Sequence, residues 1–521
     1  MNTGRNTGIF SRNSLIRLFI LIVLFLSVFS GAKALRLDTA DPSTRMLYHA
    51  MPMALSWRYF NWPHNYTANF SIAMDFQNPA YKTFADKVGK AMARDRFEGA
   101  GQYFWNVDDR GLGDYAILSL ILFGASLKGL FYFYFILLML TVGAFWVGLR
   151  KSADAHAYCV VLLAGLLTCL PIWPNAPGVA DFAEVTVHLS ESRLFGLLAL
   201  FPAAHMLLFA RQSGRIGRVE LICLLGQVGF FVFLFHARSS IIWQVGALLL
   251  LFAAQAGWQY VSTRKLSSRI AVCAGVFAIS VFVLLPIYQR VVYHKHYFGE
   301  EGARTVWHNM VIGMMYSPVF GKNQIGDDAT AIRLVLEREK ALRHPHDPNY
   351  TVPDQLQKAL NSLGSHNRYD WRGHEAAAKD YLLATLREHP WTFIKLYVYE
   401  KPRAILLLTK CHLALPGLDG GCKPAWRAWP WIGFSMVLVF AVAVLQGISG
   451  DRGARYNELT WITFFLSLCA LLPPIVFYPS LVTNAEWLMC IVVMLLLQAH
   501  RLGINTGGRL QLSSQHRRQY Q

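Results

Sequence analysis

Long apolar runs constrain this chain more than any other feature of its sequence. A helix needs about 20 mainly apolar residues to cross a bilayer, and such runs predict about ten spans. They lie at 13–35, 127–149, 156–173, 194–210, 219–235, 241–260, 270–288, 428–447, 459–478 and 485–500. Because 54% of the 521 residues are hydrophobic and 15% are charged, composition also favours an all-α polytopic membrane protein over a soluble one.

The positive charge of the chain predicts how the spans are oriented. The net charge is +18, but the basic residues are scattered between apolar runs, so we expect no nucleic acid partner. They gather on every second connection, and cytoplasmic connections are the ones enriched in Lys and Arg. Both termini are therefore predicted to be cytoplasmic. The predicted inner positions include Arg5, Arg12, Arg17, Arg150, Lys151, Arg211, Arg215, Arg218, Arg264, Lys265, Arg269, Arg452, Arg455 and Arg501.

This orientation divides the chain into alternating membrane and soluble parts. The predicted parts are a cytoplasmic tail at 1–12, the first span at 13–35, an extracytoplasmic loop at 36–126, spans two to seven at 127–289, a large extracytoplasmic domain at 290–427, spans eight to ten at 428–500 and a basic cytoplasmic tail at 501–521. The first span is favoured as an uncleaved anchor, although "GAKA" before Leu35 resembles the cleavage site of a signal peptide.

The segment His389–Cys411 is apolar enough to resemble a further span. Its charged residues argue against that, and so does the topology, because another crossing would move the following basic connection to the outer side. We predict an amphipathic helix on the outer membrane surface, with a kink or stop at Pro402.

An acidic pair stands at the end of the first outer loop. In "NVDDRGLGDYAILSLILFG", Asp108 and Asp109 precede a short helix predicted at about 113–124, a break at Gly124 and a span that descends from Ser126. The topology puts the pair at the outer membrane face, and carboxylates near hydrocarbon usually have a function. The alternative is that one aspartate caps the helix and the other is solvated.

This organisation resembles the GT-C type of glycosyltransferase, whose members are integral membrane enzymes that use polyprenyl-phosphate-linked sugars. The shared features are a cytoplasmic N-terminus, one span, a long outer loop with an acidic pair, many further spans and a second outer domain. The resemblance implies that Asp109 or Asp108 is the catalytic base or helps to place a divalent metal, with no other cofactor expected. This chain has Asp-Asp-Arg-Gly where several branches of the family have Asp-Glu.

The resemblance also implies the partners and the location. The donor would be a polyprenyl-phosphate-linked sugar, and the acceptor a hydroxyl on a glycan, a lipid or a protein. Transfer would take place at the outer face of a bacterial plasma membrane, among membrane lipids.

Sugar transfer from a lipid phosphate also needs a cation that stabilises the departing phosphate. Arg238, in the outer turn "FHARSSIIWQ", is the first candidate because a guanidinium group matches phosphate oxygens; the alternative is an arginine that only reaches lipid headgroups. His308, in "RTVWHNMVIGM", begins an apolar stretch too short to span, which predicts a segment against the outer membrane face. Its imidazole is a candidate for phosphate binding or proton transfer, with a structural role as the alternative.

Four further residues complete the candidates. Lys401 and Arg403 are predicted to meet lipid headgroups, where either would touch the donor phosphate or only anionic lipid. Cys411 and Cys422 are the only cysteines that the topology places outside, which predicts a disulfide across a Pro/Gly-rich loop. Earlier in the same outer segment, Asp327 and Asp328 are interpreted as a turn and the start of an amphipathic helix in preference to a second acidic site.

Three other functions remain open at this stage. A ligase of the O-antigen type would use an outer arginine and histidine, Arg238 and His308, and no acidic base. A transporter or flippase for lipid-linked sugars is less favoured, because the chain shows no paired halves and no convincing acid in mid-span. A non-catalytic protein whose outer parts bind a partner is the third.

Overall fold

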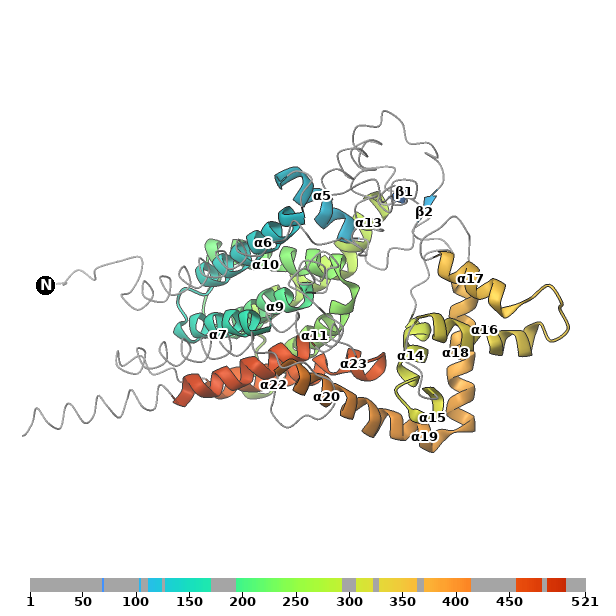
Figure 1. Cartoon of the computed structure of the whole chain (residues 1–521). Helices are drawn as coiled ribbons and strands as arrows, with labels where there is room; N and C mark the ends of the chain where they lie inside the picture. Colours follow the sequence, from blue (N-terminus) through green and yellow to red (C-terminus); the bar gives the residue numbers. More distant parts are fainter. Residues whose placement is uncertain are drawn as a thin grey trace, which may run out of the picture.

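The computed structural model describes residues 68–69, 103–104, 111–123, 127–169, 194–292, 306–321, 328–362, 370–413, 456–479 and 485–502 (Figure 1). Within them, the only strands are β1 (Ala68–Asn69) and β2 (Tyr103–Phe104), which pair antiparallel. All other regular elements there are helical. The described part of the chain is therefore all-α, as predicted.

The larger group of helices forms a bundle. Its members are α5 (Gly111–Phe123), α6 (Leu127–Gly148), α7 (Ala153–Cys169), α9 (Phe195–Arg211), α10 (Arg218–Ala237), η4 (Ser239–Ile241), α11 (Ile242–Thr263), α12 (Ser268–Ile279), η5 (Ser280–Leu284), α13 (Leu285–Val292), α22 (Tyr456–Ala470), α23 (Leu472–Val476) and a last helix, Ala485–Leu502. Helix α10 packs against α6 and α9, and α11 packs against α9 and α22. The short helix predicted before span two is α5, and the predicted break separates it from α6.

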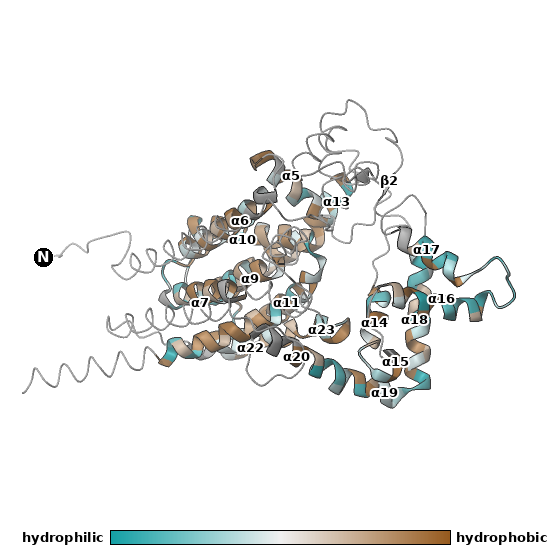
Figure 2. Ribbon diagram, in the orientation of Figure 1, coloured by the Kyte–Doolittle hydropathy of each residue, from teal (hydrophilic) through white to brown (hydrophobic). Residues whose placement is uncertain are grey.

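Five continuous helical segments of the described chain are long and apolar enough to cross a membrane. They are Arg218–Ala237, Ser239–Thr263, Ser268–Val292, Leu459–Val476 and Ala485–Leu502. The bundle also exposes large apolar side chains, among them Ile222 at 67% and Val261 at 71%, and Figure 2 shows the apolar character of these helices. Exposed apolar surface of this kind marks a membrane or partner contact, so the fold indicates a membrane protein.

The other predicted spans divide into two groups. Helices α6, α7 and α9 are apolar, but their apolar stretches are shorter than those of the five spans. The predicted spans at 13–35 and 428–447 lie outside the described residues.

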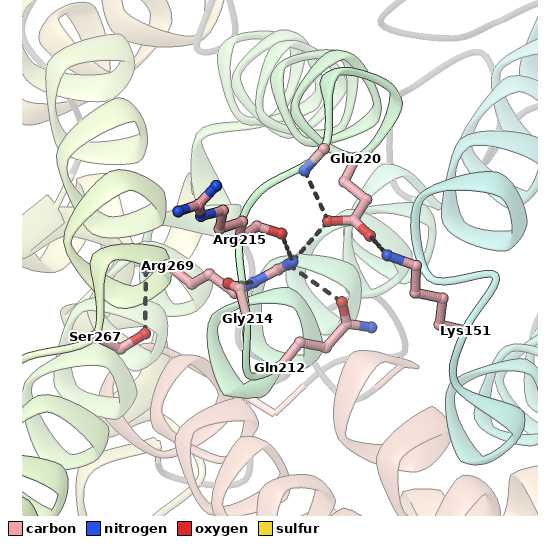
Figure 3. A network of polar contacts seen from close by, with 8 residues as sticks. Lys151, Gln212, Gly214, Arg215, Glu220, Ser267 and Arg269 are labelled. Carbon is pink, nitrogen blue, oxygen red and sulfur yellow. Dashed lines mark hydrogen bonds and ion pairs between the residues drawn. The ribbon is translucent and has the colours of Figure 1, made fainter.

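A buried ion network joins three connections at one end of the bundle (Figure 3). Glu220, near the start of α10, accepts hydrogen bonds from Arg269 of α12 at 2.6 Å and from Lys151 of the α6–α7 connection at 3.0 Å. Arg269 and Glu220 are only 2% and 3% exposed. Arg269 also donates to the carbonyl oxygens of Gly214 and Arg215 in the α9–α10 connection. The connections after α6, α9 and α11 therefore lie at the same end, as an alternating bundle requires.

Two helices of the described chain contain a π turn, and a proline explains each one. In η5 and in η8 (Leu396–Glu400), the following N–H bonds to the carbonyl five residues back. Pro286 and Pro402 each lie two residues after the last residue of the turn. Because proline lacks an N–H and its ring clashes with the carbonyl four residues earlier, a wider turn lets the helix continue. The predicted stop at Pro402 is therefore wrong, since the helix continues through it to Leu413, while the predicted kink there stays a prediction.

A second group of helices lies beside one end of the bundle (Figure 1). It contains α14 (Val306–Met314), α15 (Pro318–Gly321), α16 (Asp328–Arg343), α17 (Val352–Ser362), α18 (Trp371–Glu388), α19 (Pro390–Lys395), η8 and α20 (Lys401–Leu413). Helix α14 packs on α18 and α16. Their shared core consists of Val311, Ile312, Met315, Ala331, Val335, Ala377 and Ala378. The amphipathic helix predicted from Asp328 is α16, whose polar surface is visible in Figure 2.

Candidate functional site

A buried polar cluster joins three helices at the bundle end opposite the ion network. Asp114, in the first turn of α5, accepts hydrogen bonds through Oδ2 from the Tyr288 hydroxyl at 2.9 Å and from His236 Nε2 at 3.0 Å. The other ring nitrogen of His236 lies 3.1 Å from the side-chain nitrogen of Gln289. Asp114 is 9% and His236 6% exposed. Helices α5, α10 and α13 thus place a carboxylate, an imidazole, a phenol and an amide together.

The partners of His236 orient its ring. Its Nε2 donates to the Asp114 carboxylate, which only accepts, and its Nδ1 faces the side-chain amide of Gln289. Contacts at both ring nitrogens therefore hold the imidazole plane in one orientation. A carboxylate that orients an imidazole in this way is a common device for holding a histidine in a functional position.

The start of α5 touches the end of α10 through a glycine. A Cβ at Gly111 would lie 2.5 Å from His236 Cδ2 and 2.6 Å from the Ala237 nitrogen, closer than any side chain tolerates. Gly111 follows the stretch Asp108-Asp109-Arg110 in the sequence. Asp108 and Asp109 themselves lie outside the described residues.

Arg238 occupies the turn that sequence predicted. Its backbone N–H donates to Leu234 O at 2.8 Å and ends α10, and its Nε donates to Ser240 Oγ at 3.1 Å. The side chain is half-buried. The guanidinium group also interacts electrostatically with Glu486. Arg238 therefore stands at the same bundle end as Asp114 and His236.

Glu486 forms a second buried cluster at this end. Its carboxylate accepts hydrogen bonds from Trp243 Nε1 and from Gln244 Nε2, which lies 3.3 Å away. The Gln244 amide also donates to Gly196 O at 2.8 Å. Glu486 is 6% exposed, and a Cβ at Gly196 would overlap its carboxylate. The acid is thus fixed between the starts of α9, α11 and the last helix.

Most members of both clusters give no functional signal in the sequence. Asp114 lies in the first turn of α5, but its contact with His236 and Tyr288 depends on how three distant helices pack. A usable signal was present for Glu486, because a carboxylate inside a predicted span is a candidate functional residue by default.

His308 does not belong to this site, contrary to the prediction that it binds the donor phosphate. It is 3% exposed in α14, and its Nδ1 lies 3.3 Å from His374 Nε2. The Glu375 carboxylate accepts hydrogen bonds from the N–H groups of Trp307 and His308, both at 2.9 Å, and so caps α14. Burial, together with His308, lowers the pKa of His374 to about 3. The apolar stretch forms a domain core because it packs on α18 instead of lying on the membrane.

Lys401 also departs from its predicted role at lipid headgroups. It is fully buried, and its Nζ donates to the carbonyl oxygens of Ile475, Val476 and Phe477 at 2.9, 3.3 and 2.8 Å. The ammonium group lies 4.0 Å from the centre of the Tyr397 ring. Burial lowers the pKa of Lys401 to about 7, while the carbonyl oxygens favour the charged form. Lys401 therefore caps the end of α23 and joins the second helical group to the bundle.

The remaining candidates are only partly covered by the described residues. Arg403 is exposed on α20. Cys411 lies in the same helix, and Cys422 lies outside the described residues, so the predicted disulfide stays a prediction. Among the residues that the structure describes, no group of three or more His, Cys, Asp or Glu side chains is arranged to hold a metal ion. The divalent metal predicted for the acidic pair thus also remains a prediction.

Comparison with protein-family models, with curated proteins and with solved structures found no match to this chain. The functional argument consequently rests on its residues and their arrangement.

Proposed function

We propose that this chain is a membrane glycosyltransferase that moves a sugar from a polyprenyl-phosphate carrier to a hydroxyl of a glycan, a lipid or a protein. One observation supports the proposal above the others. Gly111, which directly follows the acidic stretch containing Asp108 and Asp109, packs against His236 and Ala237, next to Arg238. The bundle thereby brings the segment that follows the predicted base to the turn that carries the predicted phosphate ligand.

The chemistry assigns a role to each group. A carboxylate of the acidic pair takes the proton of the acceptor hydroxyl, whose oxygen forms a bond to the anomeric carbon of the sugar. The bond between that carbon and the phosphate oxygen breaks, and the polyprenyl phosphate leaves with the electron pair. Arg238 stabilises the negative charge on the departing phosphate. Asp114 acts as a positioning residue, since it orients His236 beside this turn.

The proposal also covers topology, fold and location. It includes about ten spans, the GT-C fold, cytoplasmic termini, location in a bacterial plasma membrane and a site at the outer face of that membrane. The alternation of basic connections supports the orientation. Where a divalent metal takes part, the acidic pair would be its ligands.

Two steps of this proposal can be tested separately, because leaving-group binding needs Arg238 and proton transfer needs the acidic pair. The purified chain is titrated with a polyprenyl phosphate, and cells that lack the native chain are assayed for the missing glycan after complementation. Arg238→Gln is expected to lose about tenfold or more in polyprenyl phosphate affinity, because a charged hydrogen bond is removed. Asp108→Asn or Asp109→Asn is expected to retain binding and lose the product.

Arg290→Gln is the matched control. Arg290 is an exposed arginine in the last turn of α13, at the same bundle end, so its loss reports only the general effect of charge. Full product formation by both single aspartate variants would disprove the acidic base. Equal losses of polyprenyl phosphate affinity in the two arginine variants would show that Arg238 has no specific role in binding the phosphate.

Transport of a lipid-linked sugar is a second candidate, and one observation favours it. Glu486 is a buried acid in the first turn of a helix that is long and apolar enough to span a membrane, and ionisable residues within such helices often mark ion or substrate pathways. Movement of a labelled polyprenyl-phosphate sugar across vesicles without a covalent product, and its loss in Glu486→Gln, would support this function. The ligase alternative would need Arg238 and His308 in one site, and His308 lies against His374 in another helical group.

A further inference from the structure

The ion-network end of the bundle contains a cavity of about 770 Å³. It lies between the α9–α10 connection and the α11–α12 connection. Arg238, Asp114 and Glu486 are all at the opposite bundle end, so this cavity is separate from the candidate functional site and does not depend on the proposed function.

The lining of the cavity is strongly basic. Arg211, Arg215 and Lys265 are among its lining residues, and the lining includes no Asp or Glu. The nearby Glu220 already accepts hydrogen bonds from Arg269 and Lys151, whereas the Arg215 and Lys265 side chains are exposed. A cavity lined by these two cations and by no Asp or Glu favours an anionic ligand, and a guanidinium group is especially suited to phosphate.

The buried ion pair holds one wall of the cavity in place. The Arg269 guanidinium donates to Gly214 O at 3.1 Å, to Arg215 O at 2.9 Å and to the Gln212 side chain at 3.2 Å. Gly214 has a φ of +96°, a backbone conformation that favours glycine. Figure 3 shows the Arg215 side chain extending away from Glu220 while its carbonyl group is held by Arg269. The loop that carries Arg215 is therefore fixed before any ligand binds.

The other wall combines apolar surface with an unsatisfied polar atom. Trp258 and Leu266 line the cavity and are 77% and 54% exposed. Gln255 lines it as well, and its Oε1 is buried with no hydrogen-bond partner among the described residues. A buried acceptor without a donor is costly, and a hydroxyl group would satisfy it. The cavity thus combines cations, an apolar margin and an acceptor for a hydroxyl group.

We propose that this cavity binds a phosphate group, namely that of an anionic phospholipid whose headgroup carries hydroxyl groups. The cations contact the phosphate, Gln255 accepts from a headgroup hydroxyl, and Trp258 and Leu266 lie beside the upper part of the acyl chains. Basic pockets between membrane helices on the cytoplasmic side are known to hold anionic headgroups.

The experiment measures lipid retention by the full chain in detergent. Native mass spectrometry follows titration with phosphatidylglycerol or phosphatidylcholine, and equilibrium dialysis follows binding of inorganic phosphate. Because one Lys or Arg near an anionic surface contributes enough for about a fivefold change in affinity, Arg215→Gln is expected to weaken phosphatidylglycerol binding about fivefold, and Arg215→Gln with Lys265→Gln about 25-fold.

Arg218→Gln provides the matched control. Arg218 is an exposed arginine three residues further along, and it does not line the cavity. Its variant is expected to bind phosphatidylglycerol within twofold of the parent chain, which is about the effect of one distant, screened charge. All three altered side chains are exposed, so thermal unfolding midpoints close to that of the parent will show that the variants are folded.

The outcomes separate the sources of the phosphate. Preferential retention of phosphatidylglycerol that depends on Arg215 and Lys265 supports the lipid site. Binding of inorganic phosphate with the same dependence, and with no preference among lipids, supports a phosphate site filled by a soluble anion. Equal retention of the two lipids without phosphate binding would overturn the proposal, and so would an equal loss in Arg215→Gln and Arg218→Gln.

Discussion

Lys401 shows at the scale of one residue how a predicted ligand becomes a structural group. Its ammonium reaches three carbonyl oxygens at the end of α23, two of them within 2.9 Å. Replacing it by Met keeps an apolar stem of similar length but removes the Nζ donor from the partly buried carbonyl oxygens of Ile475 and Phe477. We expect Lys401→Met to lower the free energy of unfolding by about 1–3 kcal/mol, measured by thermal unfolding of the detergent-solubilised chain.

Lys358→Met is the control for this variant. Lys358 is an exposed lysine of α17 in the same helical group. Replacement of an exposed side chain away from buried contacts usually changes stability by no more than about 0.5 kcal/mol, so its loss should have a small effect. A destabilisation by Lys358→Met as large as that by Lys401→Met would contradict the capping role.

His374 gives the second residue-scale prediction, which concerns pH. Its pKa is about 3 in the fold and 6.5 in the unfolded chain. The unfolded chain therefore binds more protons between these two values, and stability falls as the pH drops below 6.5. Between pH 7.5 and pH 5 this group alone should remove about 2 kcal/mol of stability. We expect His374→Gln to show a smaller drop in unfolding temperature over this interval than the parent chain.

His346→Gln is the matched variant for the pH experiment. His346 is exposed in the α16–α17 connection, so its replacement should leave the pH dependence of the parent unchanged. If His374→Gln and His346→Gln lost the same stability on acidification, the buried histidine pair would not be its source.

Residue types alone identified some site positions and misassigned others. Arg238 was placed correctly in its turn because two long apolar runs leave only a few residues between them. His308 and Lys401 were misassigned because their surroundings are made by α18 and α23, which are distant in sequence. A basic or imidazole side chain has the same sequence signal whether it faces a phosphate or caps a helix.

At the scale of elements, the contact between α14 and α23 depends on one glycine. A Cβ at Gly313 would lie 1.7 Å from Phe477 O and 2.7 Å from Lys401 Nζ, so an alanine there forces the two helices apart. Overpacking of this kind costs about 1–3 kcal/mol. We expect Gly313→Ala to lower the thermal unfolding midpoint and to increase cleavage of the second helical group by a protease.

Gly143→Ala in α6 is the corresponding control. A Cβ at Gly143 meets nothing within 4 Å, and alanine is the better helix former by about 0.5–1 kcal/mol. Its midpoint should stay equal or rise. A rise in Gly313→Ala as well would show that α14 and α23 are not in close contact.

Element positions were predicted better than element ends. Apolar runs predicted the positions of α6, α9, α10 and α11 to within a few residues. An apolar run of this length has few stable structures other than a helix. The helix around Pro402 was placed correctly, but a stop at Pro402 is wrong, since a proline signal does not distinguish a stop from a π turn. Whether the helix stops or widens into a π turn depends on which backbone carbonyl groups find hydrogen-bond donors in the surrounding structure.

At the scale of the whole molecule, the proposed orientation can be tested by cysteine labelling. Arg215→Cys lies at the ion-network end of the bundle, and Lys340→Cys lies in α16 of the second helical group. The proposed topology puts these two positions on opposite sides of the membrane. In intact spheroplasts, an impermeant maleimide is expected to label Lys340→Cys above the parent chain, and to label Arg215→Cys only after permeabilisation.

The outcome against this topology is equally clear. Labelling of both positions in intact spheroplasts would place both ends of the bundle on one side, which no set of spanning helices allows. The sequence could supply a prediction of the orientation because basic connections repeat along the chain. It could not supply the docking of the second helical group, because that depends on the close contact at Gly313 and on the Lys401 cap.

The π turn η5 has a consequence for how the polar cluster tolerates change in chain length. A π turn amounts to one extra residue within an α-helix, and each residue advances the helix by about 100°. Tyr288 and Gln289 follow η5. The direction in which their side chains point around the helix axis therefore depends on that one extra residue. A deletion of one residue within Ser280–Leu284 would rotate both side chains by about 100°, away from Asp114 and His236, and would bring the Pro286 ring back against the carbonyl group four residues earlier. The cluster is thus far more sensitive to a deletion in η5 than to a conservative substitution there.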